Sequence, residues 1–182
     1  MTILTSVMQF AMLPLQGLGQ GAQPIISYNY GAGNSNRVRR AYRLLLTCSV
    51  CYAMIFCLLI QLFPGVFAAI FTSNAELLAF TKPMLRIYTL ALGLFGIQIA
   101  CQMTFTSLGN AKASIIVAVM RKFILLLPLI YMMPHLYTAD LTKAVFMAEP
   151  VADVLAVAFT GVLFFFEFRK ALRAMPKSEK RS

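Results

Sequence analysis

The chain has 182 residues, of which 60% are hydrophobic and only 12% are charged, and its formal net charge is +10. Soluble domains contain about 45–50% apolar and about 25% charged residues, so this composition excludes an ordinary soluble domain. About 20 residues of helix cross a hydrocarbon core. Five stretches are long enough, which predicts an all-α membrane protein: residues 3–30, 42–63, 84–107, 113–134 and 143–168.

The first stretch, residues 3–30, is apolar around most of its circumference but carries one polar stripe. At about 100° per residue, the stripe covers about 60° of the helix. Uncharged polar groups at bilayer depth must face protein or water, and they often mark a substrate path. The stripe therefore predicts a transport function. Its members are Thr5, Gln9, Gln16, Gln20, Gln23 and Ser27.

The second stretch, residues 42–63, is nearly uniformly apolar and ends at Pro64 and Gly65. Residues 65–82 then mix apolar with polar side chains. This mixture predicts a short amphipathic segment at the outer membrane surface, in which Ser73 or Asn74 caps a helical turn.

The third stretch, residues 84–107, repeats the pattern of the first. Tyr88, Gln98, Gln102 and Thr106 share an arc of about 80° on a continuous helix, and the opposite face is apolar. We therefore predict a second helix that lines a cavity.

Glu149 and Asp153 are the carboxylates that lie well inside the fifth stretch, one helical turn apart. Two carboxylates so close in a low dielectric do not both ionise cheaply, so one of them is a candidate to bind a coupling Na⁺ or H⁺. Alternatively, Glu149 lies near the outer end of the span and is simply hydrated. Arg121 and Lys122 could neutralise these acids, but we expect both to extend to the inner interface instead.

The basic residues predict the orientation of the chain. Thirteen of the sixteen Lys and Arg residues follow the first span, lie near the start of the fourth or follow the fifth. By the positive-inside rule these ends are cytoplasmic, which makes residues 1–168 a transmembrane bundle and residues 169–182 a basic cytoplasmic tail. We expect the tail to contact anionic lipid rather than nucleic acid. Met1 would then lie outside, directly before an apolar helix, which suggests a truncated chain.

Several motifs that resemble catalytic or cofactor sites are incomplete. Residues 17–22 fit a glycine-rich nucleotide loop, but no strand precedes them. Cys48 and Cys51 have no second ligand pair, and His135 is the only histidine. We therefore expect no bound metal, no cofactor beyond the coupling ion, and no enzymatic activity.

The sequence resembles that of a known protein family. Residues 20–33, QGAQPIISYNYGAG, followed by an arginine cluster, resemble the signature of multidrug and toxic compound extrusion (MATE) transporters. Residues 102–112, Pro128 and residues 149–153 match as well. The resemblance covers essentially the whole chain and is closest to the bacterial multidrug export branch called MepA-like.

The resemblance implies a twelve-helix exporter in the bacterial plasma membrane, of which this chain forms the last five helices. It implies antiport of cationic or aromatic drugs against Na⁺ or H⁺, through a cavity shared with an N-terminal bundle. No acid occurs in residues 84–107, where some branches of the family bind a cation, so the partner bundle could hold the coupling site. The candidate substrate-cavity residues are Gln16, Gln20, Gln23, Asn29, Tyr88, Gln98 and Gln102.

Two alternatives to drug export remain open. A lipid-linked oligosaccharide flippase of the related superfamily would favour a strongly basic cavity over glutamines. The chain could also be a structural remnant with no transport activity of its own.

Overall fold

In the computed structural model of the chain, the described residues are 2–72, 74–89, 92–136 and 141–175. Every regular element among them is a helix, as the composition predicts. In chain order the elements are α1 (Thr2–Gly31), α2 (Ser35–Leu62), α3 (Pro64–Ala69), α4 (Ala75–Tyr88), α5 (Leu92–Ser107), α6 (Ala111–Val119), the π-helical η1 (Met120–Leu126), α7 (Leu127–Leu136) and α8 (Leu141–Ala174).

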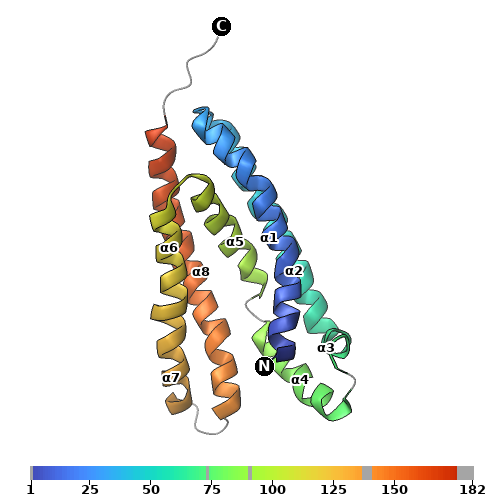
Figure 1. Cartoon of the computed structure of the whole chain (residues 1–182). Helices are drawn as coiled ribbons and strands as arrows, with labels where there is room; N and C mark the ends of the chain where they lie inside the picture. The colour runs from blue at the N-terminus through green and yellow to red at the C-terminus, as the bar shows by residue number, and fades with distance from the viewer. Residues whose placement is uncertain (1, 73, 90–91, 137–140, 176–182) are drawn as a thin grey trace.

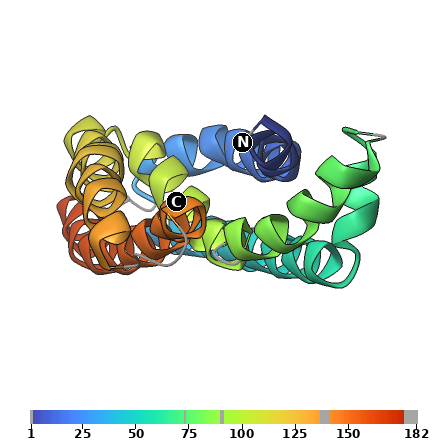
Figure 2. The ribbon, with the colours of Figure 1, turned by 90° about the horizontal axis from the view of Figure 1, so that it is seen from below.

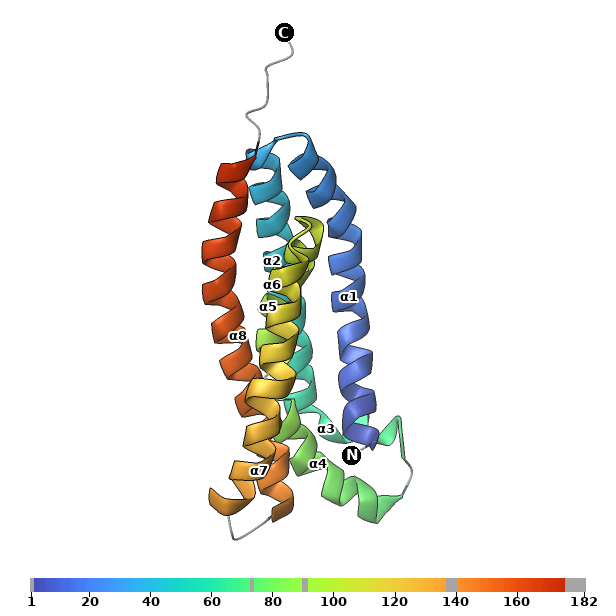
Figure 3. The same ribbon diagram turned by 60° about the vertical axis from the view of Figure 1, so that its left-hand side comes forward.

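Helix α5 occupies the middle of the molecule (Figure 1). Helices α1 and α2 pack on one side of it, α8 packs on the other side, and η1 and α7 pack against α8. Seen from the end, α1 and α6 lie on one face of the molecule, and α2 and α8 lie on the other (Figure 2). The turn between α1 and α2 and the last turn of α8 lie at the same end (Figure 3).

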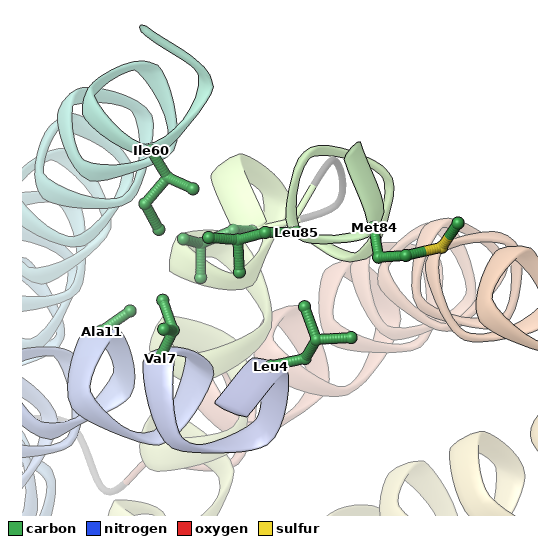
Figure 4. Close-up of a cluster of buried hydrophobic side chains, with 7 residues drawn as sticks. Leu4, Val7, Ala11, Ile60, Met84 and Leu85 are labelled. Carbon is green, nitrogen blue, oxygen red and sulfur yellow. The ribbon is translucent and has the colours of Figure 1, made fainter. Parts of the chain in front are cut away.

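The apolar side of α1 is buried against its neighbours. Val7 and Ala11 point toward Ile60 of α2 and Leu85 of α4 in one apolar cluster (Figure 4). All four side chains are 0–1% exposed. The face of α1 that carries the glutamines is therefore turned away from this core.

The predicted spans agree with the observed helices at both ends of the chain. The first and fifth stretches lie within α1 and α8, and α2 begins seven residues earlier than predicted. Pro14, Pro24 and Pro150 lie inside helices without ending them.

The prediction of one continuous helix over residues 84–107 is wrong. The stretch is divided between α4 and α5, which are bent by 55°. Thr89 ends α4, and its hydroxyl donates a hydrogen bond to the carbonyl oxygen of Leu85 at 2.8 Å. Beyond the break, α5 lies so close to α2 that a Cβ on Gly96 would fall 2.5 Å from the carbonyl oxygen of Ser49. The bend directs α5 into this contact.

The fourth predicted span is also modified, because its middle turn is a π-helix. Pro128 has no N–H to donate to the carbonyl of residue 124, and its ring would clash with that carbonyl in a regular α-helix. The wider turn of η1, which ends two residues before the proline, relieves this clash.

The segment that follows Pro64 is capped as predicted. The side-chain oxygen of Asn74 accepts hydrogen bonds from the backbone N–H groups of Glu76 at 3.0 Å and Leu77 at 3.3 Å. This satisfies two of the free donors at the start of α4. The alternative cap, Ser73, lies outside the described residues.

Three helical stretches among the described residues are long and apolar enough to cross a membrane: Ser35–Leu62, Lys112–Tyr131 and Pro150–Ala174. The bent pair Glu76–Ile87 and Leu92–Ser107 would make a fourth. Helix α1 is not among them, because its polar stripe lowers its hydropathy, although its 30 residues reach about 45 Å. For the chain to cross the membrane five times, α1 must therefore span the membrane with its polar stripe turned away from lipid.

Two turns at one end of the bundle have the same construction. Gly33 and Gly109 adopt φ values of 71° and 70°, which suit glycine. The next residue in each turn, Asn34 or Asn110, donates its backbone N–H to a carbonyl five residues back, at 2.9 and 3.0 Å. These contacts close α1 and α5 and allow α2 and α6 to begin at once.

The contact between Gly96 and Ser49 leads to a testable prediction. Gly96→Ala should lower the free energy of unfolding by about 1–3 kcal/mol, because the new methyl group must push backbone away from backbone. Gly161→Ala on α8 is the matched control, since a Cβ there meets no atom within 4 Å. Denaturant unfolding in detergent micelles measures both variants, and equal stability would contradict the close approach.

Candidate functional site

The polar stripe of α1 lies on the open side of that helix. Gln9, Gln16 and Gln20 are exposed, whereas Gln23 is half-buried. At the end of the stripe, the hydroxyl of Ser27 donates a hydrogen bond to the carbonyl oxygen of Ser107 at 2.9 Å. The stripe therefore ends where α1 meets α5.

The polar residues of α5 are more deeply placed. Gln98 is only 4% exposed, and its carbonyl oxygen Oε1 accepts no hydrogen bond from the described part of the chain. Gln102 is half-buried, and Thr106 is exposed. The side chain of Tyr88 lies outside the described residues. A buried amide oxygen without a donor is costly, so Gln98 is suited to accept a hydrogen bond from water or a ligand.

Helices α1 and α5 cross closely beside these glutamines. A Cβ on Gly19 would lie 2.5 Å from Cγ of Met103. Gln20 and Gln102 are the chain neighbours of these two contact residues. The absence of a side chain at Gly19 thus allows α1 and α5 to approach each other closely beside Gln20 and Gln102.

Asn29 lies apart from the glutamines. It is 7% exposed, and its side-chain nitrogen Nδ2 donates a hydrogen bond to the carbonyl oxygen of Ile25 at 2.8 Å. It lines a groove of about 1050 Å³ between α1 and α2, together with Arg37 and Arg40. At about 100° per residue, this groove lies on roughly the opposite side of α1 from the glutamine stripe. The residues that the family resemblance groups together therefore occupy two surfaces.

Asp153 of α8 pairs with Arg121 of η1. The guanidinium nitrogen Nε lies 2.8 Å from the carboxylate oxygen Oδ1, and the two side chains are 26% and 4% exposed, respectively. The carbon Cζ of Arg121 also lies 4.6 Å from the centroid of the Phe95 ring on α5. The pair thus joins three helices, and it is largely shielded from solvent.

This pair corrects the expectation that Arg121 extends to the inner interface. A carboxylate buried as deeply as that of Asp153 requires compensation, and Arg121 supplies it within the bundle. The side chain of Lys122, predicted to behave in the same way, lies outside the described residues. The side chain of Glu149 also lies outside them, so its relation to Asp153 stays a prediction.

A second polar contact, missed by the sequence analysis, fixes the start of α6. Asn110 donates from Nδ2 to Oε2 of Glu167 at 3.0 Å, while its Oδ1 accepts a hydrogen bond from the backbone N–H of Ala113 at 3.2 Å. The cap itself follows from an asparagine after a glycine turn. The partner on α8, Glu167, follows only from the tertiary structure.

The polar groups of these helices can bind a ligand through hydrogen bonds. The exposed glutamines of α1 carry uncharged amides, and Asp153 and Arg121 compensate each other's charge. Among the described residues, no three His, Cys, Asp or Glu side chains are grouped as a metal site.

The comparison with protein families identifies the chain. The MatE family model matches residues 1–132. A comparison with curated protein sequences gives no match.

Solved structures have the same fold. The MATE multidrug transporter DinF-BH, solved as a complex, is 31% identical, with a TM-score of 0.80 over 92% of this chain and 36% of its own. A multidrug resistance MATE family transporter of the MOP superfamily is 17% identical in both of two conformations. Its inward-facing form has a TM-score of 0.84 over 94% of this chain and 39% of its own. Its outward-facing form has a TM-score of 0.85 over 95% of this chain and 39% of its own.

The chain thus spans less than two fifths of the length of these transporters. The family match covers well over half of the chain, and the helices have the matching fold. The protein therefore belongs to the MATE family of membrane transporters.

Proposed function

We propose that the chain forms part of a multidrug exporter, in which the open polar faces of α1 and α5 line the drug path. The observation that carries this proposal is the exposed row of Gln9, Gln16 and Gln20 on a helix whose other side is packed in an apolar core. Lipid does not tolerate such a row, so it faces water or protein. The similarity to solved structures of multidrug transporters supports this interpretation.

The substrates that fit this surface are cationic or aromatic compounds. Carboxamide oxygens accept hydrogen bonds from a cation without the desolvation penalty of a fixed negative charge. Gln98 adds a buried oxygen that accepts no hydrogen bond from the described residues, and Gln102 lies beside the crossing of the two helices. A lipid-linked oligosaccharide would instead require basic groups on this face, where the chain offers glutamines.

The proposed transport cycle moves this bundle as one body against a partner bundle that supplies the remaining helices. Similarity of this fold to inward-facing and outward-facing transporters, with nearly equal TM-scores, favours rigid movement over internal rearrangement. The cavity would then open alternately to the two sides of the membrane.

Coupling to Na⁺ or H⁺ through this chain would use Asp153 or Glu149. Because Arg121 already compensates Asp153, an incoming cation or proton must release that guanidinium. Coupling through Asp153 would therefore be an exchange of partners, and the alternative is an acid in the partner bundle.

We propose that the protein resides in a bacterial plasma membrane with the α1–α2 turn and the C-terminus in the cytoplasm. This predicts that a cysteine at Asn36 is blocked from an impermeant maleimide in intact cells, whereas one at Asn74 reacts. The four native cysteines are first replaced by serine. Labelling at Asn36 with protection at Asn74 would reverse the orientation.

Dye efflux in cells that lack their own exporters tests the function itself. The chain is expressed alone and also fused after the first seven helices of a related exporter. Export of a cationic dye by the fused protein but not by an empty membrane supports the proposal. A correctly inserted fusion that exports no cationic dye would favour an inactive structural remnant.

A further inference from the structure

A small basic groove lies between α2 and α8, at the end of the bundle where α1 turns into α2. Its volume is about 410 Å³. Arg39 and Arg43, one helical turn apart on α2, and Arg169 on α8 line it. All three side chains are exposed. Three guanidinium groups from two helices therefore converge on one surface.

The floor of the groove is aromatic and firmly packed. The ring of Tyr42 stacks on Phe164, with centroids 4.6 Å apart, and lies 5.1 Å from the ring of Phe168. The guanidinium carbon of Arg169 lies 4.3 Å from the centroid of the Phe165 ring. The aromatic rings thus hold Arg169 at the groove and offer an apolar surface beside the charges.

No acid of the described chain neutralises this groove. The salt bridge found among the described residues joins Arg121 to Asp153, in a different part of the bundle. Glu167, the carboxylate of α8 close in sequence to Arg169, accepts a hydrogen bond from Asn110 instead. Three uncompensated positive charges favour an anionic ligand.

We infer that this groove binds an anionic phospholipid with two phosphate groups, of the cardiolipin kind. Guanidinium groups bind phosphate oxygens in pairs, and basic pockets between transmembrane helices on the cytoplasmic side suit such head groups. Val162 and Phe165, which are 60% and 52% exposed, continue from the groove toward the middle of α8. They provide an apolar path for acyl chains that a free phosphate ion would not use. The inference depends on membrane insertion with this end of the bundle in the cytoplasm, as proposed above, but not on drug export.

Native mass spectrometry of the purified full chain tests the site, with cardiolipin and phosphatidylcholine as probes. Each arginine near anionic lipid changes affinity about fivefold, so Arg39→Gln, Arg43→Gln and Arg169→Gln together should weaken cardiolipin binding on the order of a hundredfold. Phosphatidylcholine binding should stay weak in both proteins. If the triple variant does not fold, Arg39→Gln and Arg169→Gln are measured singly, and each should weaken cardiolipin binding about fivefold.

The matched control removes the same charge elsewhere. Arg37→Gln, Arg40→Gln and Lys112→Gln alter side chains outside this groove and should leave cardiolipin binding within about twofold. Equal losses in both triple variants would show that net charge alone attracts the lipid, and would overturn the site. Displacement of cardiolipin by inorganic phosphate would also overturn it, because the ligand would then be a free anion.

Discussion

Asp153→Asn should lower the free energy of unfolding of this chain by about 3 kcal/mol, because it leaves the guanidinium of Arg121 without its carboxylate in a shielded site. Arg121→Gln should be similarly damaging, since Asp153 is 4% exposed and loses the donor 2.8 Å away. Asp153→Asn nearly preserves side-chain volume, so loss of packing contributes little there, whereas Arg121→Gln also removes the guanidinium that packs on the Phe95 ring. Denaturant unfolding in detergent micelles measures the effect.

The double variant Arg121→Met with Asp153→Leu should recover most of this stability. Apolar residues of similar size can replace a buried ion pair at little net cost, whereas removal of one partner leaves an uncompensated charge. A double-mutant cycle completed with the single variants Arg121→Met and Asp153→Leu would then give a coupling energy of about 2–3 kcal/mol. Additive losses would mean that the pair makes no net contribution in the folded chain.

The same Asp153→Asn variant also tests ion coupling in a transporter completed with its partner bundle. If Asp153 exchanges a proton or holds Na⁺, dye efflux at matched protein level should lose its dependence on the imposed ion gradient. If the carboxylate serves only to join η1 to α8, the amount of folded protein should fall while the remaining efflux keeps its gradient dependence. The second result would assign coupling to other residues.

Replacing Gln20, Gln23 and Gln102 together by leucine should reduce efflux of cationic dyes at least tenfold in a completed transporter. Each lost hydrogen bond to a charged ligand removes about 1.5–3 kcal/mol of binding free energy, although water replaces part of it. Membrane insertion should persist, because the change removes polar groups from a span. Efflux is measured at matched protein level.

Gln61→Leu provides the control for this experiment. Gln61 lies on α2, and its side-chain nitrogen donates to the carbonyl oxygen of Arg86 at 2.8 Å. The substitution is chemically the same but lies outside the glutamine faces of α1 and α5. Efflux should be retained in this variant. Unchanged efflux in the triple variant would remove these glutamines from the drug path.

The sequence predicts much of the fold because helical period and turn chemistry are local. The limits of α1, the glutamine stripe and the cap at Asn74 all follow from residues close together in the chain. The break between α4 and α5 does not. The bend leads α5 to the close approach of Gly96 to Ser49, and the identity of that partner is set by tertiary packing.

The sequence likewise predicts only part of the candidate site. The sequence placed Asp153 inside a span, but its contact with Arg121 depends on the relative rotation of α8 and η1. The position of Asn29 is different, because the helical period alone separates it from the glutamines by more than about 90°. Family resemblance grouped these residues by motif, whereas the helix presents them to different neighbours.

Cysteine protection by substrate tests most directly whether the glutamine faces of α1 and α5 line the drug path. Single cysteines at Gln20, Gln102 and Ile25 are compared in a completed transporter with its native cysteines replaced. Ile25 is the control, since it is 55% exposed and lines the groove on the other side of α1. A hydrophilic maleimide should react at Gln20 and Gln102, and a cationic dye should slow both reactions without affecting Ile25. Dye protection at Ile25 alone would contradict the account and place the drug between α1 and α2.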